Sequence, residues 1–142
     1  LAKEYDLPKI VSDFIPMHHG TTRVEYFYQM ALKQESDKKN VDENQFRYPG
    51  PKPNTKETGI LMICEAVEAA VRSIKNPDII KIEAMINKII KDRIDDGQLD
   101  ECPLTLAELK KIVGTVDGNS GMLSVLRGIY HIRIEYPDKP IK

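Results

Sequence analysis

The sequence predicts an all-α fold, and three observations support this prediction. Apolar residues recur three and four positions apart in several separate stretches, which is the spacing of one face of an α-helix. Residue pairs typical of helix starts precede some of these stretches, as at residues 105–108. Apolar and polar residues alternate as in a strand only in the short and ambiguous phrase IRIEY at residues 132–136.

Length and composition favour one globular domain over residues 1–142. Hydrophobic residues make up 41% of the chain and charged residues 30%, so it can bury a core. The formal net charge of −1 gives no electrostatic reason to bind DNA, RNA or an anionic membrane. Cys64 and Cys102 have no metal or redox spacing and predict no disulfide framework, which favours the reducing cytoplasm. No apolar run approaches the ~20 residues that cross a bilayer.

The first predicted helix ends at a pair of histidines. Pro8 suits the first turn of this helix, whereas Pro16 distorts its end because proline lacks a backbone donor. Gly20 can close the helix in the left-handed conformation. His18 and His19 therefore lie in or near the last turn. The apolar residues that define this helix by their spacing are Leu7, Ile10, Val11, Phe14 and Ile15.

A second helix is predicted to begin at a capping box, in which Thr22 and Glu25 satisfy each other's backbone donors. It should run to about Lys38. A polar, proline-rich connection then follows over residues 40–54, and loops of this length are usually functional or disordered. Two aromatic residues within the connection argue against plain disorder, because such side chains anchor a loop. The second helix is expected to bury Val24, Phe27, Tyr28 and Ala31.

The segment 55–75 is predicted to be the central helix. It is apolar on nearly all sides, which is typical of a helix buried in the core. Glu65 is notable there, because a buried carboxylate needs a cation, a metal ion or a proton. Glu68 and Arg72 are four residues apart and can pair with each other. Glu65 is thus left to find a different partner.

The second half of the chain predicts three further helices. Asp78 caps a helix that carries a stripe of isoleucines and ends at Gly97, and this stripe is core or partly a dimer face. The capping box at residues 105–108 opens a short helix that ends near residue 113. The flexible connection GTVDGNSG leads to a last helix, which Pro137 must end.

Histidine nitrogens and carboxylate oxygens are ligands for Mn, Fe or Zn. His18, His19 and Glu65 are the set available here. Neighbouring residues of a regular helix point about 100° apart, so the two histidines can share one ion only where the helix unwinds before Gly20. The alternative is that both imidazoles merely occupy a helix C-terminus, which the helix dipole favours slightly.

Four phrases of the chain form a further pattern. They are HHGTT, FRYPGPKPNTKETGILMICEAVEAAVRS, IIKDRIDDGQLDECPLTLAELKKI and RGIYHIRIEYP, in this order. Together they strongly resemble the C-terminal part of the cytosolic HD domain of seven-transmembrane HD-domain phosphodiesterases, the bacterial PgpH-type enzymes that hydrolyse cyclic di-AMP. The resemblance covers nearly the whole chain. It implies an HD-like helical bundle.

The resemblance also implies two divalent ions in the intact domain, with iron or manganese expected. His18 and His19 match the histidine pair that binds the second ion, and Glu65 falls where the family has a late Asp. The family's earlier His, its His-Asp pair and a further His would precede Leu1, and the chain opens without Met. We therefore interpret the chain as a fragment that lacks the N-terminal helices of the domain, and we expect it to be inactive by itself.

Four side chains are candidates for binding the nucleotide. Lys52, Lys56 and Arg72 can donate charge-assisted hydrogen bonds to phosphates, although Arg72 can pair with Glu68 instead. Tyr48 can stack on a base or anchor its loop. Arg133 is a further, weaker candidate for binding a phosphate.

Three functions are compatible with these residues. The first is a metal-dependent phosphodiesterase domain that hydrolyses a cyclic dinucleotide. This domain would lie at the cytosolic face of a membrane, attached only through an N-terminal transmembrane region outside this chain. The second is a degenerate HD relative that senses a nucleotide without catalysis, as Glu65 in place of Asp suggests. The third is a helical assembly module with incidental histidines. A homodimer is compatible with each of them.

Overall fold

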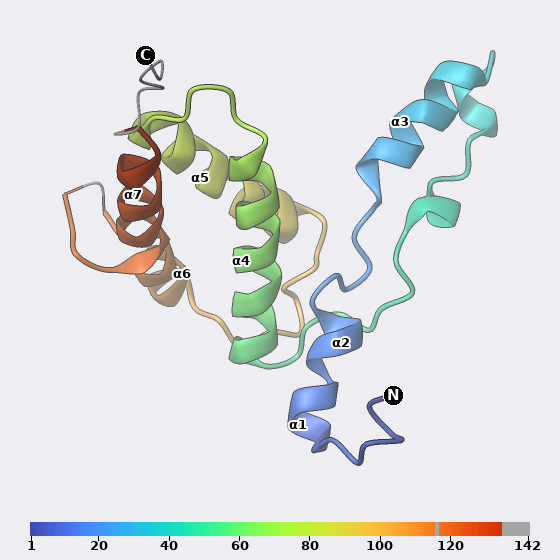
Figure 1. Cartoon of the computed structure of the whole chain (residues 1–142). Helices are drawn as coiled ribbons and strands as arrows, with labels where there is room; N and C mark the ends of the chain where they lie inside the picture. The colour runs from blue at the N-terminus through green and yellow to red at the C-terminus, as the bar shows by residue number, and fades with distance from the viewer. Residues whose placement is uncertain (116, 135–142) are drawn as a thin grey trace, which may run out of the picture. The chain divides into compact units, whose positions relative to one another are not determined.

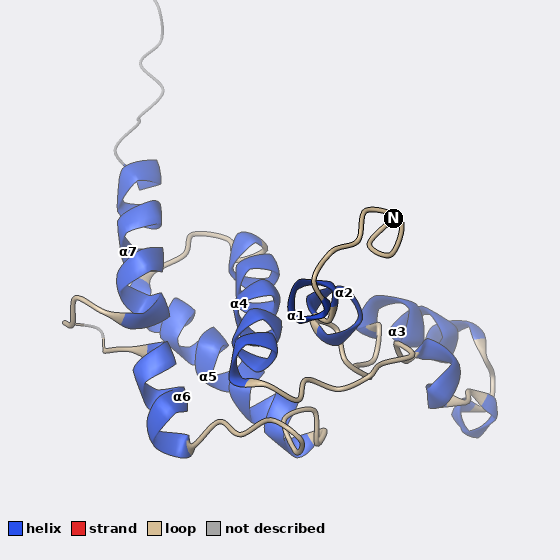
Figure 2. Cartoon of the chain, turned by 90° about the horizontal axis from the view of Figure 1, so that it is seen from below, coloured by secondary structure: helices blue, strands red, loops and turns tan. Residues whose placement is uncertain are grey.

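The computed structural model of the chain describes residues 1–115 and 117–134, and over these residues it is helical (Figures 1 and 2). The described residues form no strand, and their β structure is limited to an isolated antiparallel bridge between Arg23 and Arg47. The predicted all-α fold is therefore confirmed. The helices are α1 (Lys9–Ser12), α2 (Phe14–Met17), α3 (Glu25–Gln34), the 3-10 helices η1 (Lys38–Asn40) and η2 (Glu43–Phe46), α4 (Lys56–Arg72), α5 (Ile79–Asp95), α6 (Leu106–Val113) and α7 (Gly121–Ile134).

The described chain divides into two compact units. The first unit consists of residues 1–62 and 93–103, and the second of residues 63–92 together with the described residues from 104 onward. The helices α4 and α5 each contribute residues to both units. No helix among the described residues has the length and the apolar composition needed to span a membrane.

The first predicted helix is broken into the two short helices α1 and α2. The break falls at Ser12 and Asp13, because the carbonyl of Ser12 would accept its hydrogen bond from Pro16, which has no N–H. Ile10 is 75% exposed and Ile15 is 59% exposed, whereas Met17 is buried. The apolar residues of this stretch therefore form a face that is largely exposed to solvent in this chain.

The predicted capping box of the second helix is wrong. The hydroxyl of Thr22 donates to the carbonyl of His19 at 2.8 Å, and Glu25 accepts instead from Arg23 and Gln29. The helix α3 begins at Glu25 without a side-chain cap and ends at Gln34, before Lys38. None of its residues is buried, so the expected burial of Val24, Phe27, Tyr28 and Ala31 is also wrong.

Most of the buried apolar side chains lie in the second unit, at the spacing of one face of a helix. On α4, Ile63, Val67 and Val71 follow one another at intervals of four and are each no more than 1% exposed. The isoleucine stripe of α5 is buried from Ile82 to Ile90, whereas Ile94 at its end is 42% exposed. The helix α6 contacts α7. The buried members of this core on α5, α6 and α7 are Ile82, Ile86, Ile89, Ile90, Leu109 and Leu123.

The predicted boundaries of α5 and α6 are confirmed. The Asp78 carboxylate accepts from the backbone N–H of Lys81 at 2.8 Å at the start of α5. Thr105 and Glu108 form the predicted capping box in both directions. Gly97 has a φ of +64°, as expected of a residue that closes a helix. The phrase IRIEY is helical through Ile134, and its end and Pro137 lie outside the described residues.

Candidate functional site

The two histidines lie in the turn that follows α2, within the first unit. Gly20 closes this turn with a φ of +55° and is buried. A Cβ atom at Gly20 would lie 2.7 Å from both the Oε1 atom of Gln98 and the Cε atom of Met62. The predicted left-handed glycine is confirmed, and the close approach means that the turn packs directly on these two buried side chains.

The His18 ring is oriented by a backbone carbonyl. Its Nδ1 atom lies 2.9 Å from the carbonyl oxygen of Phe14, one helical turn earlier. Because a carbonyl only accepts, Nδ1 carries the proton, and the lone pair of the neutral ring is on Nε2. Histidines that ligate metal ions are commonly held this way, with one ring nitrogen bound to protein and the other directed at the ion.

His19 lies between two aromatic neighbours. Its ring centroid is 4.0 Å from that of His18, with the planes tilted by 39°. It stacks on Tyr48 at 4.2 Å with the planes only 13° apart. Both imidazoles are half-buried, so they are neither frayed into solvent nor locked in a core. The structure therefore brings His18, His19 and Tyr48 together.

The proline-rich loop lies against this turn. A Cβ atom at Gly50 would lie 3.0 Å from the Cγ2 atom of Thr21, and one at Gly20 would lie 3.3 Å from the Cδ atom of Pro53. Lys52 belongs to the same loop and is half-buried, with its Nζ atom 3.5 Å from the place that a Cβ of Gly97 would take. The loop thus positions one of the predicted phosphate-binding lysines.

Glu65 and Arg72 belong to the second unit. The expectation that Glu65 is buried is wrong: it is exposed, because α4 buries Ile63 and Val67 and residue 65 is about 200° around the helix from residue 63. Arg72 donates to Glu68, as predicted, and both are exposed. Lys56 is the first residue of α4 and is half-buried. The metal-binding role of Glu65 and the phosphate-binding role of Arg72 stay predictions.

The two imidazoles are a suitable but partial ligand set for a divalent transition ion. Among residues 1–115 and 117–134, no three His, Cys, Asp or Glu side chains gather closely enough to hold a metal ion. Tetrahedral metal sites use four ligands and octahedral sites use six. The chemistry and the orientation of the histidine pair fit a metal ion, and further donors are needed to complete its shell.

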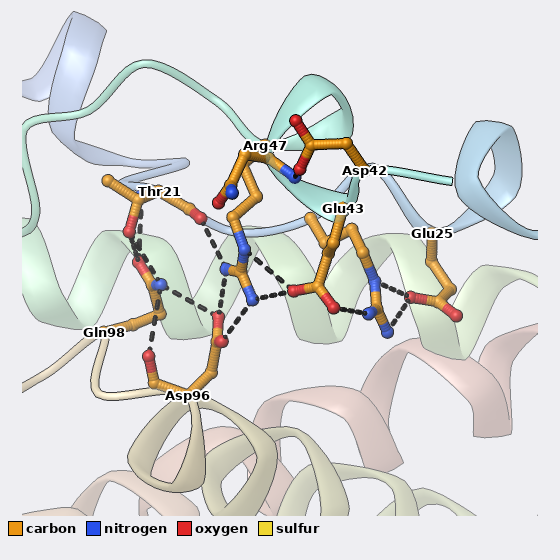
Figure 3. Close-up of polar contacts among 9 residues, drawn as sticks. Thr21, Glu25, Asp42, Glu43, Arg47, Asp96 and Gln98 are labelled. Carbon is orange, nitrogen blue, oxygen red and sulfur yellow. Dashed lines mark hydrogen bonds and ion pairs between the residues drawn. The ribbon is translucent and has the colours of Figure 1, made fainter. Parts of the chain in front are cut away.

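A polar network that sequence reasoning did not predict holds the histidine turn at Thr21 (Figure 3). Arg47 donates to both carboxylate oxygens of Asp96, at 2.8 and 3.0 Å, and to the carbonyl of Thr21 at 2.8 Å. On its other side Arg47 donates to Glu43. A signal for these residues existed, because Arg47 lies in the phrase FRYPGPKP and Asp96 in IIKDRIDDGQLDE.

The same pairing shifts the ionisation of both partners. The hydrogen bond from Arg47 holds the pKa of the Asp96 carboxyl below its usual value, against the opposing effect of partial burial. The hydrogen bond with Asp96 likewise raises the pKa of Arg47 above that of a free guanidinium. Both groups are therefore charged at neutral pH.

Comparison with known proteins adds an independent observation. No model of a known protein family matches the chain. It is 43% identical to the cyclic-di-AMP phosphodiesterase PgpH of Bacillus subtilis, and 46% identical to that of Listeria monocytogenes, over 97% of its own length in each case. Its fold matches the crystal structure of the L. monocytogenes PgpH HD domain in complex with cyclic di-AMP with a TM-score of 0.80 and 43% identity, over 91% of this chain.

This chain is a homologue of the PgpH HD domain. A second crystal structure of that domain matches with a TM-score of 0.78 and 45% identity over 92% of the chain. The chain spans 18% of the length of the two curated PgpH proteins and 56% of each solved HD-domain chain. The predicted resemblance and the HD-like helical fold are thus confirmed, and the chain matches part of the solved PgpH HD domain.

Gly20→Ala tests whether the HD-domain turn requires glycine. We expect a loss of about 2 kcal/mol or more in unfolding free energy, because Ala is strained at this φ and its Cβ collides with Gln98 and Met62. Gly128→Ala is the matched control: it lies within α7 with nothing within 4 Å of a Cβ, and Ala should stabilise it by about 0.5–1 kcal/mol. Urea unfolding followed by circular dichroism measures both. Equal effects of the two variants would contradict the packing of the turn.

Asp96→Asn tests the ion pair with Arg47. At neutral pH we expect a loss of about 1–2 kcal/mol, since a charge-assisted hydrogen bond is removed from a half-buried site. Because the folded-state pKa of Asp96 is lowered, its contribution is complete above the unfolded value of about 3.9. The contribution is lost as the pH falls through the folded-state pKa.

Unfolding free energies of the wild type and Asp96→Asn should therefore converge below about pH 4. The exposed Asp100→Asn, in the same segment, is the control and should change stability by less than about 0.5 kcal/mol at neutral pH. A difference between wild type and Asp96→Asn that stays constant from pH 7 to pH 2 would show that the carboxylate charge does not contribute.

Proposed function

We propose that this chain is part of the catalytic domain of a metal-dependent phosphodiesterase that hydrolyses a cyclic dinucleotide, with cyclic di-AMP as the favoured substrate. The observation that carries the proposal is the His18–His19 turn. One ring is fixed through Nδ1 and the other is stacked at its side, in a chain 43–46% identical to PgpH proteins. The Phe14 carbonyl sets the tautomer that places the lone pair on Nε2, as in histidines that ligate metal ions.

His18 and His19 would bind one of two divalent ions, with iron or manganese as the favoured metals. Glu65 stays the predicted carboxylate ligand, and the remaining ligands would come from the part of the HD domain that this chain does not span. When bound, such a pair of ions supplies an activated water and neutralises the phosphate oxygens during in-line attack. The chain by itself would then be inactive, because too few ligands remain to hold two ions.

Lys52 is the best candidate among the four predicted substrate-binding residues. It is half-buried and lies in the loop that packs on the histidine turn. Its ammonium group can therefore contact a phosphate with a smaller loss of side-chain entropy than a fully exposed lysine would have. Tyr48 stacks on His19 and so supports the turn as well as offering a ring to a base. Arg72 already pairs with Glu68, which makes its role at a phosphate weaker. Lys56 stands at the start of α4 and completes the set.

The second candidate function is nucleotide sensing by a degenerate HD domain. Glu65 favours this alternative, since the resemblance implies Asp at this position and one extra methylene moves the carboxylate. A helical assembly module remains a third candidate, and a homodimer and a place at the cytosolic face of a membrane are further predictions. These alternatives differ in whether a metal ion and a nucleotide bind, and in whether turnover follows.

Metal binding by the chain itself gives the first test. Mn²⁺ added to the purified chain should broaden the imidazole proton signals of His18 and His19 in nuclear magnetic resonance spectra, because a paramagnetic ion relaxes nearby nuclei. His18→Ala and His19→Ala should each weaken Mn²⁺ binding by at least about 10-fold, whereas His131→Ala, at the remaining histidine of the chain, should not. Equal weakening by all three variants would mean that binding is nonspecific.

Turnover gives the second half of the same test. A polypeptide extended to include the rest of the HD domain should hydrolyse cyclic di-AMP with Mn²⁺ or Fe²⁺, and His18→Ala or His19→Ala should lower the rate by at least about 100-fold with helical content unchanged. Nucleotide binding without hydrolysis would favour the sensing function. Metal-dependent turnover by the 142-residue chain alone would contradict the incomplete ligand set.

A further inference from the structure

Gln98 is the most completely buried polar side chain of the first unit, with 1% of its surface exposed. A buried amide without partners would cost about 1–3 kcal/mol, so its partners identify its role. Its Oε1 atom accepts from the backbone N–H of Thr21 at 2.9 Å, and its Nε2 atom donates to the Thr21 hydroxyl at 2.9 Å. These contacts span 77 residues of sequence. Gln98 therefore connects the histidine turn to the segment that follows α5.

The orientation of the Gln98 amide is set by Asp96. The Nε2 atom donates to the Oδ2 atom of Asp96 at 2.9 Å. Because an ionised carboxylate only accepts, the NH₂ end must face Asp96, which leaves the carbonyl end for the N–H of Thr21. Arg47 fixes this carboxylate through two hydrogen bonds and so fixes the amide indirectly.

The four residues close a ring. Thr21 gives its N–H to Gln98, Gln98 donates to Asp96, Asp96 accepts from Arg47, and Arg47 returns a donor to the carbonyl of Thr21 (Figure 3). Both backbone polar atoms of Thr21 are thus bound by side chains instead of by a helix or a strand. We call the three side chains of Arg47, Asp96 and Gln98 the Thr21 clamp.

The clamp acts on the histidines through one short stretch of backbone. Thr21 follows Gly20, whose missing Cβ leaves room for the Oε1 atom of Gln98, and Gly20 follows the two imidazoles directly. The carbonyl of His19 is held at the same time by the hydroxyl of Thr22. Thr21 is therefore connected to the backbone of the histidines through Gly20 and is followed by Thr22, which binds the His19 carbonyl; ligand placement is sensitive to shifts of a fraction of an ångström.

We propose that Gln98 is a positioning residue for the metal-binding turn: locked by Arg47 and Asp96, its amide holds Thr21 and thereby sets the directions of the His18 and His19 rings. This inference rests on the proposed function for the identity of the bound ion. The holding of Thr21 itself is independent of any metal.

Gln98→Met is the test, because Met has a similar volume and cannot form the hydrogen bonds. We expect the Thr21 amide to exchange its hydrogen at least about 10-fold faster than in the wild type, and Mn²⁺ to bind at least about 10-fold more weakly. Gln98→Glu places a second carboxylate against Asp96 in a buried site, so it should lose at least as much as Gln98→Met in both measurements.

Thr58→Val is the matched control, since Thr58 is also buried in the first unit and hydrogen-bonds locally to Thr55. Thr58→Val should lower the stability of the chain. Its Mn²⁺ affinity should stay within about twofold of the wild type, and so should the exchange rate of the Thr21 amide once the change in global unfolding is subtracted. The inference would be overturned if Gln98→Met left Mn²⁺ affinity and Thr21 amide exchange unchanged. It would also be overturned if Thr58→Val changed both quantities as much as Gln98→Met does. If the wild-type chain binds no Mn²⁺ at the histidines, the proposed function fails, and the holding of Thr21 is judged on amide exchange alone.

Discussion

The ion pair between Arg47 and Asp96 joins two parts of the chain that no local pattern would bring together. One partner lies in the connection before α4 and the other just after α5, 49 residues apart. Each is only partly exposed, at 24% and 31% of the side chain, so the pair is less screened than a surface salt bridge. Because Arg47 also binds the carbonyl of Thr21, the pair fixes the histidine turn as well as the two segments.

Elements set by neighbouring residues could be predicted from the sequence. The capping box at Thr105, the cap at Asp78 and the left-handed glycines need only a few residues in a row, and each is present. The central helix and the isoleucine stripe were also predicted with nearly the right boundaries. Helical periodicity is a local property, so a single sequence carries it.

Predictions that depended on tertiary context failed or could not be made. Thr22 matches a capping box, yet its hydroxyl donates to the carbonyl of His19, three residues earlier, and so closes the histidine turn instead. Glu65 is in an apolar run, but not every position of that run is buried, and Glu65 is exposed. The Thr21 clamp spans 77 residues at its longest, and polar side chains give no periodic signal of such a pairing.

The histidine pair links the geometry to the homology with the PgpH HD domain. The chain is similar to PgpH of Bacillus subtilis over 97% of its length, and within it the carbonyl of Phe14 orients the His18 ring. The most direct measurement of this central claim is the tautomer of His18 in the metal-free chain at pH 8, from long-range proton–nitrogen correlation spectra. The account predicts a proton on Nδ1 and a bare Nε2; a ring protonated on Nε2 would contradict it.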